Sequence, residues 1–390
     1  MHKQMKLIYC IHSIYNPGGM ERVLLNKVAY LVERYGWDIT IVTTNQSGRP
    51  PFYPFPEGVK IVDLGVNYSA GDAEGAVKKI FTYFQKRRQH RKALTEFLMR
   101  ERADVVVSLF PSESSFIPDI KDGSKKVLEL HFNKFFRLQY NRGGVIGLLD
   151  RFRTWQDERL VRRFDKFVVL TEEDKGYWGA MTNIQVIPNA AKVVVGKMSD
   201  VKSKRVIAVG RLDYQKGFDR LVKAWDIVIK EPCLKGWRLD IFGQGEWQQM
   251  LNDMIQQRGI ADVTAVNAPT NNIGKEYAES SLLVMSSHYE GLPMVMIEAM
   301  AYGLPVVTFD YKCGPKDIIT TDHNGVLVPE GNIEALAEAM KRVMLDDEYR
   351  ARLSAEASKI TQKYDEERVM QMWYDLFQTL KKQNETTATN

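Results

Sequence analysis

The sequence predicts an α/β protein made of two successive domains with parallel sheets, and three observations lead to this prediction. Short apolar runs rich in Val and Ile alternate with longer helical patterns along the chain, which is typical of β–α–β units. A polar segment at residues 189–202 divides this alternation into two series. The chain has 390 residues, more than one ordinary hydrophobic core contains.

The first series accounts for a domain over residues 1–190. We expect its strands at residues 6–11, 38–43, 59–62, 104–109, 126–130, 166–170 and 184–187, and helices at 19–35, 77–102 and 150–164. Ligands of such sheets bind beyond the carboxyl ends of the strands, so the loops that follow the strands are the places to search for chemistry.

The second series accounts for a domain over residues 191–364, which begins with the interdomain linker at 189–202. We expect its strands at residues 204–209, 238–242, 263–266, 282–285, 305–308 and 325–328. Helices are expected at 333–345, 347–363 and 365–382, followed by a frayed polar tail.

Composition limits the location of the protein. No apolar run reaches the about 18 to 20 residues that a membrane span needs, and the apolar stretch at the N-terminus is too short for a signal peptide. The three cysteines, Cys10, Cys233 and Cys313, are scattered and lack metal-ligand spacing. Since an odd, scattered set fits a reducing compartment, we expect a cytoplasmic protein.

The segment at residues 286–305 (SSHYEGLPMVMIEAMAYGLP) is the richest in the chain. It follows an apolar strand, and Pro293 is suited to the first position of the next helix, whose free N–H groups would attract a diphosphate. Glu290 precedes this helix and Glu298 lies within it, so their carboxylates could contact the two ends of a nucleotide-sugar through paired hydroxyls. The alternative is one helix-terminal charge and one solvated glutamate.

The segment at residues 209–217 (VGRLDYQKG) places two cations after a strand. Arg211 and Lys216 could stabilise the charge of a departing nucleoside diphosphate. No D-x-D motif for Mg²⁺ or Mn²⁺ occurs in the sequence, so we expect no metal and no other cofactor, and the protein itself must neutralise the leaving group. The alternative is that both cations are surface charges.

The first strand ends in a loop with two glycines. Gly18 and Gly19 would allow backbone to approach a ligand immediately before a helix. An ordinary helix-start turn explains the pair equally well.

Together these motifs resemble those of family 4 glycosyltransferases, which have the GT-B fold of two Rossmann-like domains whose parallel sheets face each other across a deep cleft. The match is carried by G-R-x-x-x-x-K-G at 210–217, F-G-x-G at 242–245, E-G-x-P-x-x-x-x-E at 290–298 and G-x-P-V-V at 303–307. In the first half, G-G-M-E at 18–21, His131 and I-P-N at 187–189 also match. Residues 313–319 and 324–325 resemble bacterial polysaccharide-assembly members, whereas the segment N-A-P-T at 267–270 departs from the usual glycine-containing loop.

The resemblance implies a retaining sugar transfer from a nucleotide-diphosphate donor, most commonly a UDP-sugar. Glu290 would then face the donor hexose and Glu298 the ribose, while Arg211 and Lys216 hold the diphosphate. It implies further donor contacts at Gly18, Gly19, Gly243, Gly291, Leu292 and Pro293. His131 would reach the sugar near its reacting carbon; the alternative is a hydrogen-bonded histidine at a strand end. The terminal helix, 365–382, would pack back on the first domain.

Charge suggests where the acceptor binds. Residues 1–200 carry a net charge of +9 and the remainder −4, so we expect a saccharide or lipid-linked saccharide acceptor on the first domain. The predicted helix at 78–102 mixes Lys and Arg with apolar residues and could lie on an anionic membrane surface at the inner face of the membrane. The alternative is an ordinary surface helix with a solvated basic face.

Three rival functions remain at this stage. Another GT-B enzyme, such as an epimerase or phosphorylase, would share the fold, and a non-catalytic nucleotide-sugar-binding subunit would share the pocket. A nucleic-acid partner is disfavoured because the basic residues lack interleaved aromatic residues or a known reading motif. The complete donor motifs favour transfer.

Overall fold

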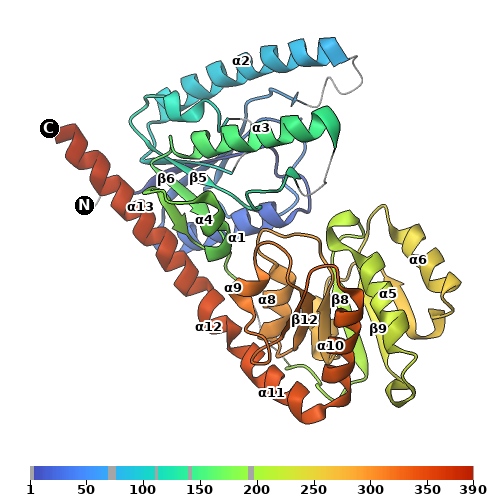
Figure 1. Ribbon diagram of the computed structural model, residues 1–390. Helices are drawn as coiled ribbons and strands as arrows, with labels where there is room; N and C mark the ends of the chain where they lie inside the picture. Colours follow the sequence, from blue (N-terminus) through green and yellow to red (C-terminus); the bar gives the residue numbers. More distant parts are fainter. Residues whose placement is uncertain (1–3, 69–75, 110–112, 139–142, 192–196, 390) are drawn as a thin grey trace.

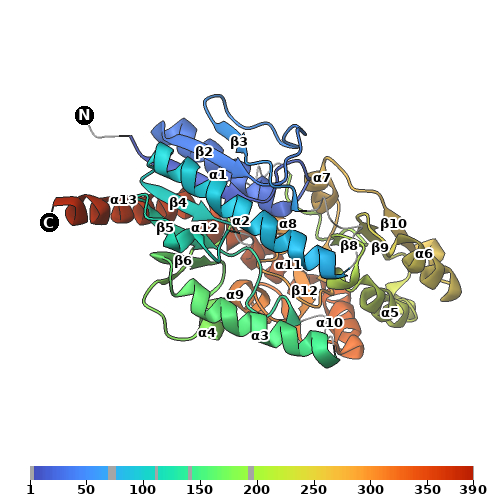
Figure 2. The ribbon, with the colours of Figure 1, turned by 90° about the horizontal axis from the view of Figure 1, so that it is seen from above.

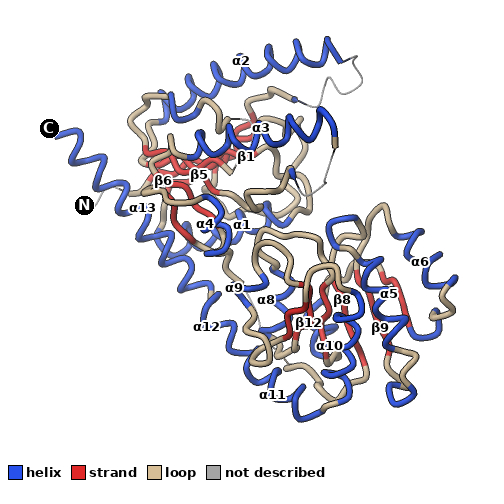
Figure 3. Tube along the Cα trace, viewed as in Figure 1, coloured by secondary structure: helices blue, strands red, loops and turns tan. Residues whose placement is uncertain are grey.

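The protein is described by a computed structural model that covers residues 4–68, 76–109, 113–138, 143–191 and 197–389. These residues form two α/β lobes joined by crossing segments (Figure 1). In each lobe one sheet lies between helices, as the colouring by secondary structure shows (Figure 3). Residues 192–196 of the expected linker lie outside the described part of the chain.

The first lobe contains a parallel sheet with seven described strands in the order β3-β2-β1-β4-β5-β6-β7. Its strands are β1 (Lys6–Ile11), β2 (Asp38–Thr43), β3 (Lys60–Asp63), β4 (Val105–Ser108), β5 (Lys125–Glu129), β6 (Lys166–Val169) and β7 (Ile184–Val186). Its helices are α1 (Gly19–Tyr35), α2 (Ala76–Glu101), α3 (Gly144–Val161) and α4 (Glu172–Trp178). The central strands are apolar and buried, as expected for a sheet covered on both faces.

The second lobe contains a parallel sheet with six described strands in the order β10-β9-β8-β11-β12-β13. Its strands are β8 (Arg205–Val209), β9 (Arg238–Phe242), β10 (Thr264–Asn267), β11 (Leu282–Met285), β12 (Val306–Phe309) and β13 (Val326–Val328). The helices of this half are α5 (Phe218–Val228), α6 (Gln248–Gln257), α7 (Ile273–Ala278), α8 (Met294–Ala301), α9 (Pro315–Ile318), α10 (Ile333–Leu345), α11 (Asp347–Ala357) and α12 (Thr361–Tyr364). The predicted α/β class with two parallel sheets is confirmed.

Strand order reverses once in each sheet, between β1 and β4 and between β8 and β11. At such a reversal the connecting helices leave on opposite faces, so the loops after the two neighbouring strands separate and leave a crevice. The predicted glycine-rich loop follows β1, and the two donor motifs follow β8 and β11. The topology therefore gathers motifs that are far apart in sequence.

The terminal helix α13 (Glu366–Thr389) returns from the second lobe along the first (Figure 1). Its apolar residues belong to the same core as β1 and α1, and these are Val369, Met370, Trp373, Leu376, Phe377 and Leu380. No helix within the described residues combines the length and apolarity that crossing a bilayer requires.

Three predicted helices differ from the structure by more than one residue at an end. Helix α3 begins at Gly144 and not at residue 150, because two glycines and an apolar run conceal its first turns. The helix expected at 347–363 is divided into α11 and α12. The tail expected to fray continues α13 to Thr389, and Asn384 anchors it by donating a hydrogen bond to the Asp104 carbonyl (3.1 Å).

Candidate active site

The loops that follow β8 and β11 bring Lys216 and Glu290 together. Lys216 Nζ lies 2.6 Å from Glu290 Oε1; the glutamate is buried and the lysine half-buried. Ser287 Oγ donates to the same carboxylate at 2.9 Å, and Gln215 Nε2 donates to its second oxygen at 3.1 Å. The carboxylate is therefore fixed in orientation by one ion pair and two hydrogen bonds, on the loop that leads into α8.

Arg211 stands apart from this pair. Its side chain is 67% exposed, lies 3.2 Å from Asp213 Oδ2 and donates to Gln215 Oε1 at 2.6 Å. Gln215 thus connects Arg211 to Glu290, because its amide nitrogen donates to one and its oxygen accepts from the other. The guanidinium is exposed to solvent, and both of its partners lie within residues 211–215.

The start of α8 lies directly beside Glu290. Pro293 is the N-cap of this helix and not its first residue, since its ψ of 85° is outside the helical range. Leu292 is buried in the core of the second lobe. Glu298, further along α8, is half-buried; burial raises the pKa of its carboxyl, and Arg22 of the other lobe opposes that rise.

Glycines allow the loops of this site to pack closely against one another. A Cβ atom at Gly243 would lie 1.9 Å from the Gly210 carbonyl oxygen, so only glycine allows the loops after β8 and β9 to touch. Gly217 has a φ of +58°, and a Cβ atom there would lie 2.4 Å from the Ser286 carbonyl oxygen. These close approaches explain the glycines of the motifs as packing requirements, whatever contacts they also make with a ligand.

The two glycines after β1 differ in their surroundings. A Cβ atom at Gly18 would lie 2.0 Å from Glu21 Oε2, whereas one at Gly19 would meet nothing within 4 Å. Gly18 is the N-cap of α1, with an extended φ of −78°. The helix-start interpretation therefore accounts for Gly18, and a role for either glycine toward a ligand stays a prediction.

His131 lies at the end of β5 in a buried network of charges. Its Nε2 lies 3.1 Å from Glu129 Oε1, which also pairs with Lys27 Nζ of α1. Lys27 Nζ in turn lies 3.7 Å from the centroid of the Trp373 ring on α13. Burial raises the pKa of Glu129, but Lys27 and His131 together outweigh it and lower the pKa to about 2.

One nitrogen of His131 has no partner in the described structure. His131 Nδ1 is buried and forms no hydrogen bond there, while Glu129 occupies the opposite nitrogen. A buried polar atom without a partner is costly in an ordinary core and is common where a ligand binds. This favours the functional interpretation of His131 over that of a satisfied core histidine.

The two lobes meet at this site. A Cβ atom at Gly291 would lie 2.3 Å from the His131 carbonyl oxygen, and Asn133 Nδ2 donates to the Glu290 carbonyl at 2.7 Å. A second contact lies near α4, where Glu173 accepts a hydrogen bond from the Cys313 backbone N–H (3.0 Å). Asp317 Oδ1 accepts another from the backbone N–H of Glu172 (2.9 Å). The segment at His131–Asn133 of the first lobe therefore lies against the segment at Glu290–Gly291 of the second.

Several residues of this site were missed by the sequence analysis. Gln215 and Ser287 lie inside the predicted motifs, beside Lys216 and before Glu290, so their position was the available signal. Asn133 follows His131 by two residues. Glu129 and Lys27 give no local signal, because their pairing joins α1 to β5 across the fold.

Comparison with known proteins identifies the family. Residues 17–193 match the family model "Glycosyltransferase Family 4", and residues 195–360 match "Glycosyl transferases group 1". The chain belongs to glycosyltransferase family 4. The two matched regions correspond to the two lobes, so the membership extends over both sides of the crevice.

This family 4 chain is similar over almost its whole length to bacterial glycosyltransferases of polysaccharide and glycan synthesis. It is 28% identical to the amylovoran biosynthesis glycosyltransferase AmsD of Erwinia amylovora, over 95% of this chain and 99% of AmsD. It is 24% identical to a Campylobacter jejuni enzyme named as an N-acetylgalactosaminyltransferase acting on a glycan linked to undecaprenol through a diphosphate, over 97% and 99% of the two chains.

Among solved structures, TarM of S. aureus, crystallised with UDP and α-GlcNAc-glycerol, shares the fold with a TM-score of 0.73. It is 17% identical, over 96% of this chain and 100% of that chain. The family 4 protein is thus a glycosyltransferase with the GT-B fold.

Proposed function

We propose that the enzyme transfers a sugar from a UDP-sugar to a saccharide acceptor, with retention of anomeric configuration and without a metal ion. The observation that carries the proposal is the Lys216–Glu290 ion pair beside the start of α8, where the backbone at His131 of the other lobe meets Gly291. Similar folds such as TarM bind UDP, which supports the choice of nucleotide.

Each donor group has a partner of suitable chemistry in this crevice. Lys216, Arg211 and the free N–H groups at the start of α8 would neutralise the diphosphate, and no cation is then needed from solution. Glu290 would accept hydrogen bonds from the hexose and Glu298 from the ribose. When the donor arrives, Lys216 would exchange part of its contact with Glu290 for the phosphate.

The step proposed is a front-face displacement. The bond between the anomeric carbon and the diphosphate oxygen breaks, and the acceptor oxygen bonds to the same face of that carbon. The acceptor proton passes to the leaving phosphate, whose charge Arg211 and Lys216 stabilise. An NMR spectrum of the product with the anomeric configuration of the donor is expected, and an inverted product would exclude the mechanism.

For the acceptor we propose a saccharide carried on a lipid, used by an enzyme that is cytoplasmic and peripheral on the inner face of the membrane. The positive charge of the first 200 residues supports an anionic environment at that lobe. The Campylobacter relative, whose name specifies a diphosphate-linked polyprenol glycan, supports the acceptor class.

The test is a donor screen with purified protein and a panel of UDP-, GDP- and ADP-sugars, with EDTA present. We expect release of UDP from one donor, reduced about 10²- to 10³-fold by Lys216→Ala and by Glu290→Ala, because each change removes a preorganised charge. Lys223→Ala, which removes a lysine paired with Asp219 on the surface of α5, is the matched control and should retain activity. Dependence on added Mg²⁺ or Mn²⁺ would contradict the metal-free mechanism, and absence of release with every donor and acceptor would contradict the transfer itself.

A further inference from the structure

Helix α3 is amphipathic, but most of its buried positions are polar and its exposed face is apolar, which is the reverse of an ordinary surface helix. Its buried positions are Asp150, Thr154, Asp157 and Val161, spaced by about one helical turn. Its exposed positions include the large apolar residues Val145, Leu148, Leu149, Phe152 and Trp155, spaced by three or four residues along the opposite face.

The polar side of α3 is turned into the protein and held there. Asp157 pairs with Arg137, and burial raises the pKa of its carboxyl despite that partner. Glu158 pairs with Lys134 Nζ at 2.5 Å. These ion pairs with residues outside the helix fix its orientation, and its apolar side is left outward.

The exposed apolar side is large. Val145 is 72% exposed and Phe152 is 52% exposed, and Phe152 stacks on Trp155 with ring centroids 5.7 Å apart. A soluble protein rarely leaves such a contiguous stripe in water, and a stripe of this kind marks a contact with another apolar body.

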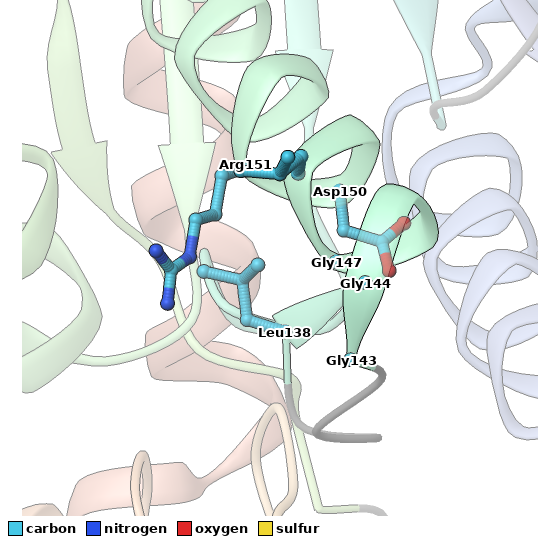
Figure 4. Close-up of a pocket in the computed structure, with 7 residues that line it drawn as sticks. Leu138, Gly143, Gly144, Gly147, Asp150 and Arg151 are labelled. Atoms are coloured by element: carbon cyan, nitrogen blue, oxygen red, sulfur yellow. The ribbon is translucent and has the colours of Figure 1, made fainter.

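The exposed charges of α3 are all positive. Arg151, Arg153 and Arg159 are exposed, while the acidic residues of this fully described helix are buried or, for Glu158, half-buried and paired with Lys134. Arg159 lies over the Trp155 ring at 3.8 Å. Around the first turns the helix also borders a hollow of about 450 Å³, where the side chains of Arg151 and Asp150 point in different directions (Figure 4).

Helix α2 also exposes apolar residues. Its second half is anchored in the core through Leu94, Phe97 and Leu98, whereas Phe81, Tyr83 and Phe84 of its first half are exposed. The two helices run in the same direction and begin at the same end of the lobe in both views (Figures 1 and 2).

Two of the basic residues of α2 donate hydrogen bonds within the first lobe. Lys86 donates to the Asn67 carbonyl, and Arg87 donates to Ser115 Oγ at 3.0 Å. The membrane surface predicted on α2 stays a prediction, and the exposed apolar stripe described above lies on α3.

We propose that the outward face of α3 docks on an anionic lipid bilayer, with its apolar stripe among the acyl chains and its arginines at the headgroups. A helix with an apolar stripe, flanking arginines and interfacial aromatic residues has the features of a segment that lies in the plane of a membrane. On α3 the one partly exposed acidic side chain, Glu158, is paired with Lys134, whereas Arg151, Arg153 and Arg159 are exposed, which favours anionic lipid over a neutral surface. The proposal deepens the membrane-bound acceptor of the proposed function and rests on it for its biological purpose.

The test uses the full chain and sedimentation with vesicles of phosphatidylcholine, with or without phosphatidylglycerol. Wild type is expected to bind the anionic vesicles and to bind them less as salt rises, because screening weakens the arginine contacts. The variant Val145→Gln/Leu149→Gln/Phe152→Gln should bind at least about tenfold more weakly, since three apolar insertions are lost. Phe52→Gln/Leu345→Gln, which alters exposed apolar residues on other segments, is the matched control and should bind as wild type does.

A second variant separates charge from apolar contact. Arg151→Gln/Arg153→Gln should lose most of the preference for anionic vesicles. Because every altered side chain is exposed, the circular dichroism spectrum and thermal midpoint of all variants should equal those of wild type.

Two outcomes would overturn the proposal. One is unchanged vesicle binding by the triple glutamine variant. The other is a wild-type dimer in sedimentation velocity that the triple variant dissolves without any vesicle binding, which would make the stripe a protein interface. UDP release from a water-soluble donor is measured on the same variants and should be unaffected, so a failure of catalysis and a failure of docking are distinguishable.

Discussion

Glu129 is a carboxylate buried in the interior of the first lobe, where an unpaired charge would be costly. It is fully buried between Lys27 and His131, and its second oxygen has no hydrogen-bond partner within the described residues. Its low pKa keeps it ionised at neutral pH, so Lys27 has a counter-charge and His131 has a fixed acceptor at Nε2. The network links α13, through Trp373, to the histidine that faces the other lobe.

Replacing this carboxylate by Glu129→Gln should therefore affect stability and activity. Removing one partner leaves Lys27 buried without a counter-charge, which costs about 3–5 kcal/mol in the free energy of unfolding. We expect this in urea denaturation at pH 7, together with a lower kcat that Lys27→Met does not reproduce, because only Glu129 orients His131. Since the pKa of Glu129 is lowered in the folded state, its contribution is present above about pH 4.3, the value of a free carboxyl, and is lost as the pH falls toward 2.

An exposed ion pair supplies the control for that experiment. Asp38→Asn breaks the pair between Lys60 and Asp38, in which the lysine is 60% exposed, and should cost less than about 1 kcal/mol. In the double variant Lys27→Met/Glu129→Gln part of the lost stability should return, because no buried charge remains. Equal small losses at both sites would show that Glu129 acts as a surface carboxylate does.

At the scale of the element, α13 is a structural part of the first lobe. Trp373 is 1% exposed, stacks on Phe377 with centroids 5.4 Å apart and covers Lys27. Trp373→Ala should lower the free energy of unfolding of this lobe by about 3–5 kcal/mol, because it leaves a large cavity in a closed core. Trp155→Ala, at a 44% exposed tryptophan of α3, should change it by no more than about 0.5 kcal/mol.

Elements built from a strong apolar pattern were predicted well from sequence. The bounds of α1, α10, β9 and β11 coincide with the prediction, because periodicity and end signals agree there, as in α1 with Gly36 in the left-handed region after its last residue. The start of helix α3 was predicted poorly, since its apolar residues face outward and its first turn begins with glycine. A pattern read from sequence assigns apolar residues to the interior, and α3 breaks that assumption.

The sequence motifs of the site could be found in advance, but the side chains that pair with the motif residues could not. Lys216 and Glu290 are 74 positions apart, and the prediction depended on two loops that follow neighbouring strands. The pairing of Glu129 with Lys27 depends on α1 crossing β5, which no local signal records. Arg211 was predicted to hold the diphosphate together with Lys216; the structure leaves its side chain exposed and paired with Asp213, and that role stays a prediction.

At the scale of the whole molecule, activity should depend on how closely the lobes approach. The proposed donor contacts come from both lobes, so closure completes the site. The approach is set by backbone at Gly291, whose hydrogen faces the His131 carbonyl, and by the hydrogen bond from Asn133 to the Glu290 carbonyl. A side chain at position 291 would act as a wedge between the lobes.

Gly291→Ala tests this directly. A Cβ atom 2.3 Å from the His131 carbonyl oxygen cannot be accommodated by backbone, and the φ of Gly291 is not one that only glycine adopts, so the obstruction lies in closure and not in the folding of the loop. We expect kcat/KM to fall at least about tenfold, because small displacements at a reacting centre are costly. The radius of gyration in small-angle scattering should exceed that of wild type when UDP is bound. UDP itself should still bind, since its charged proposed ligands, Lys216 and Arg211, and the start of α8 lie in the second lobe. Gly176→Ala in α4, where a Cβ atom meets nothing within 4 Å, is the matched control. If Gly291→Ala retained both the scattering profile and the activity of wild type, closure at this contact would play no part in transfer.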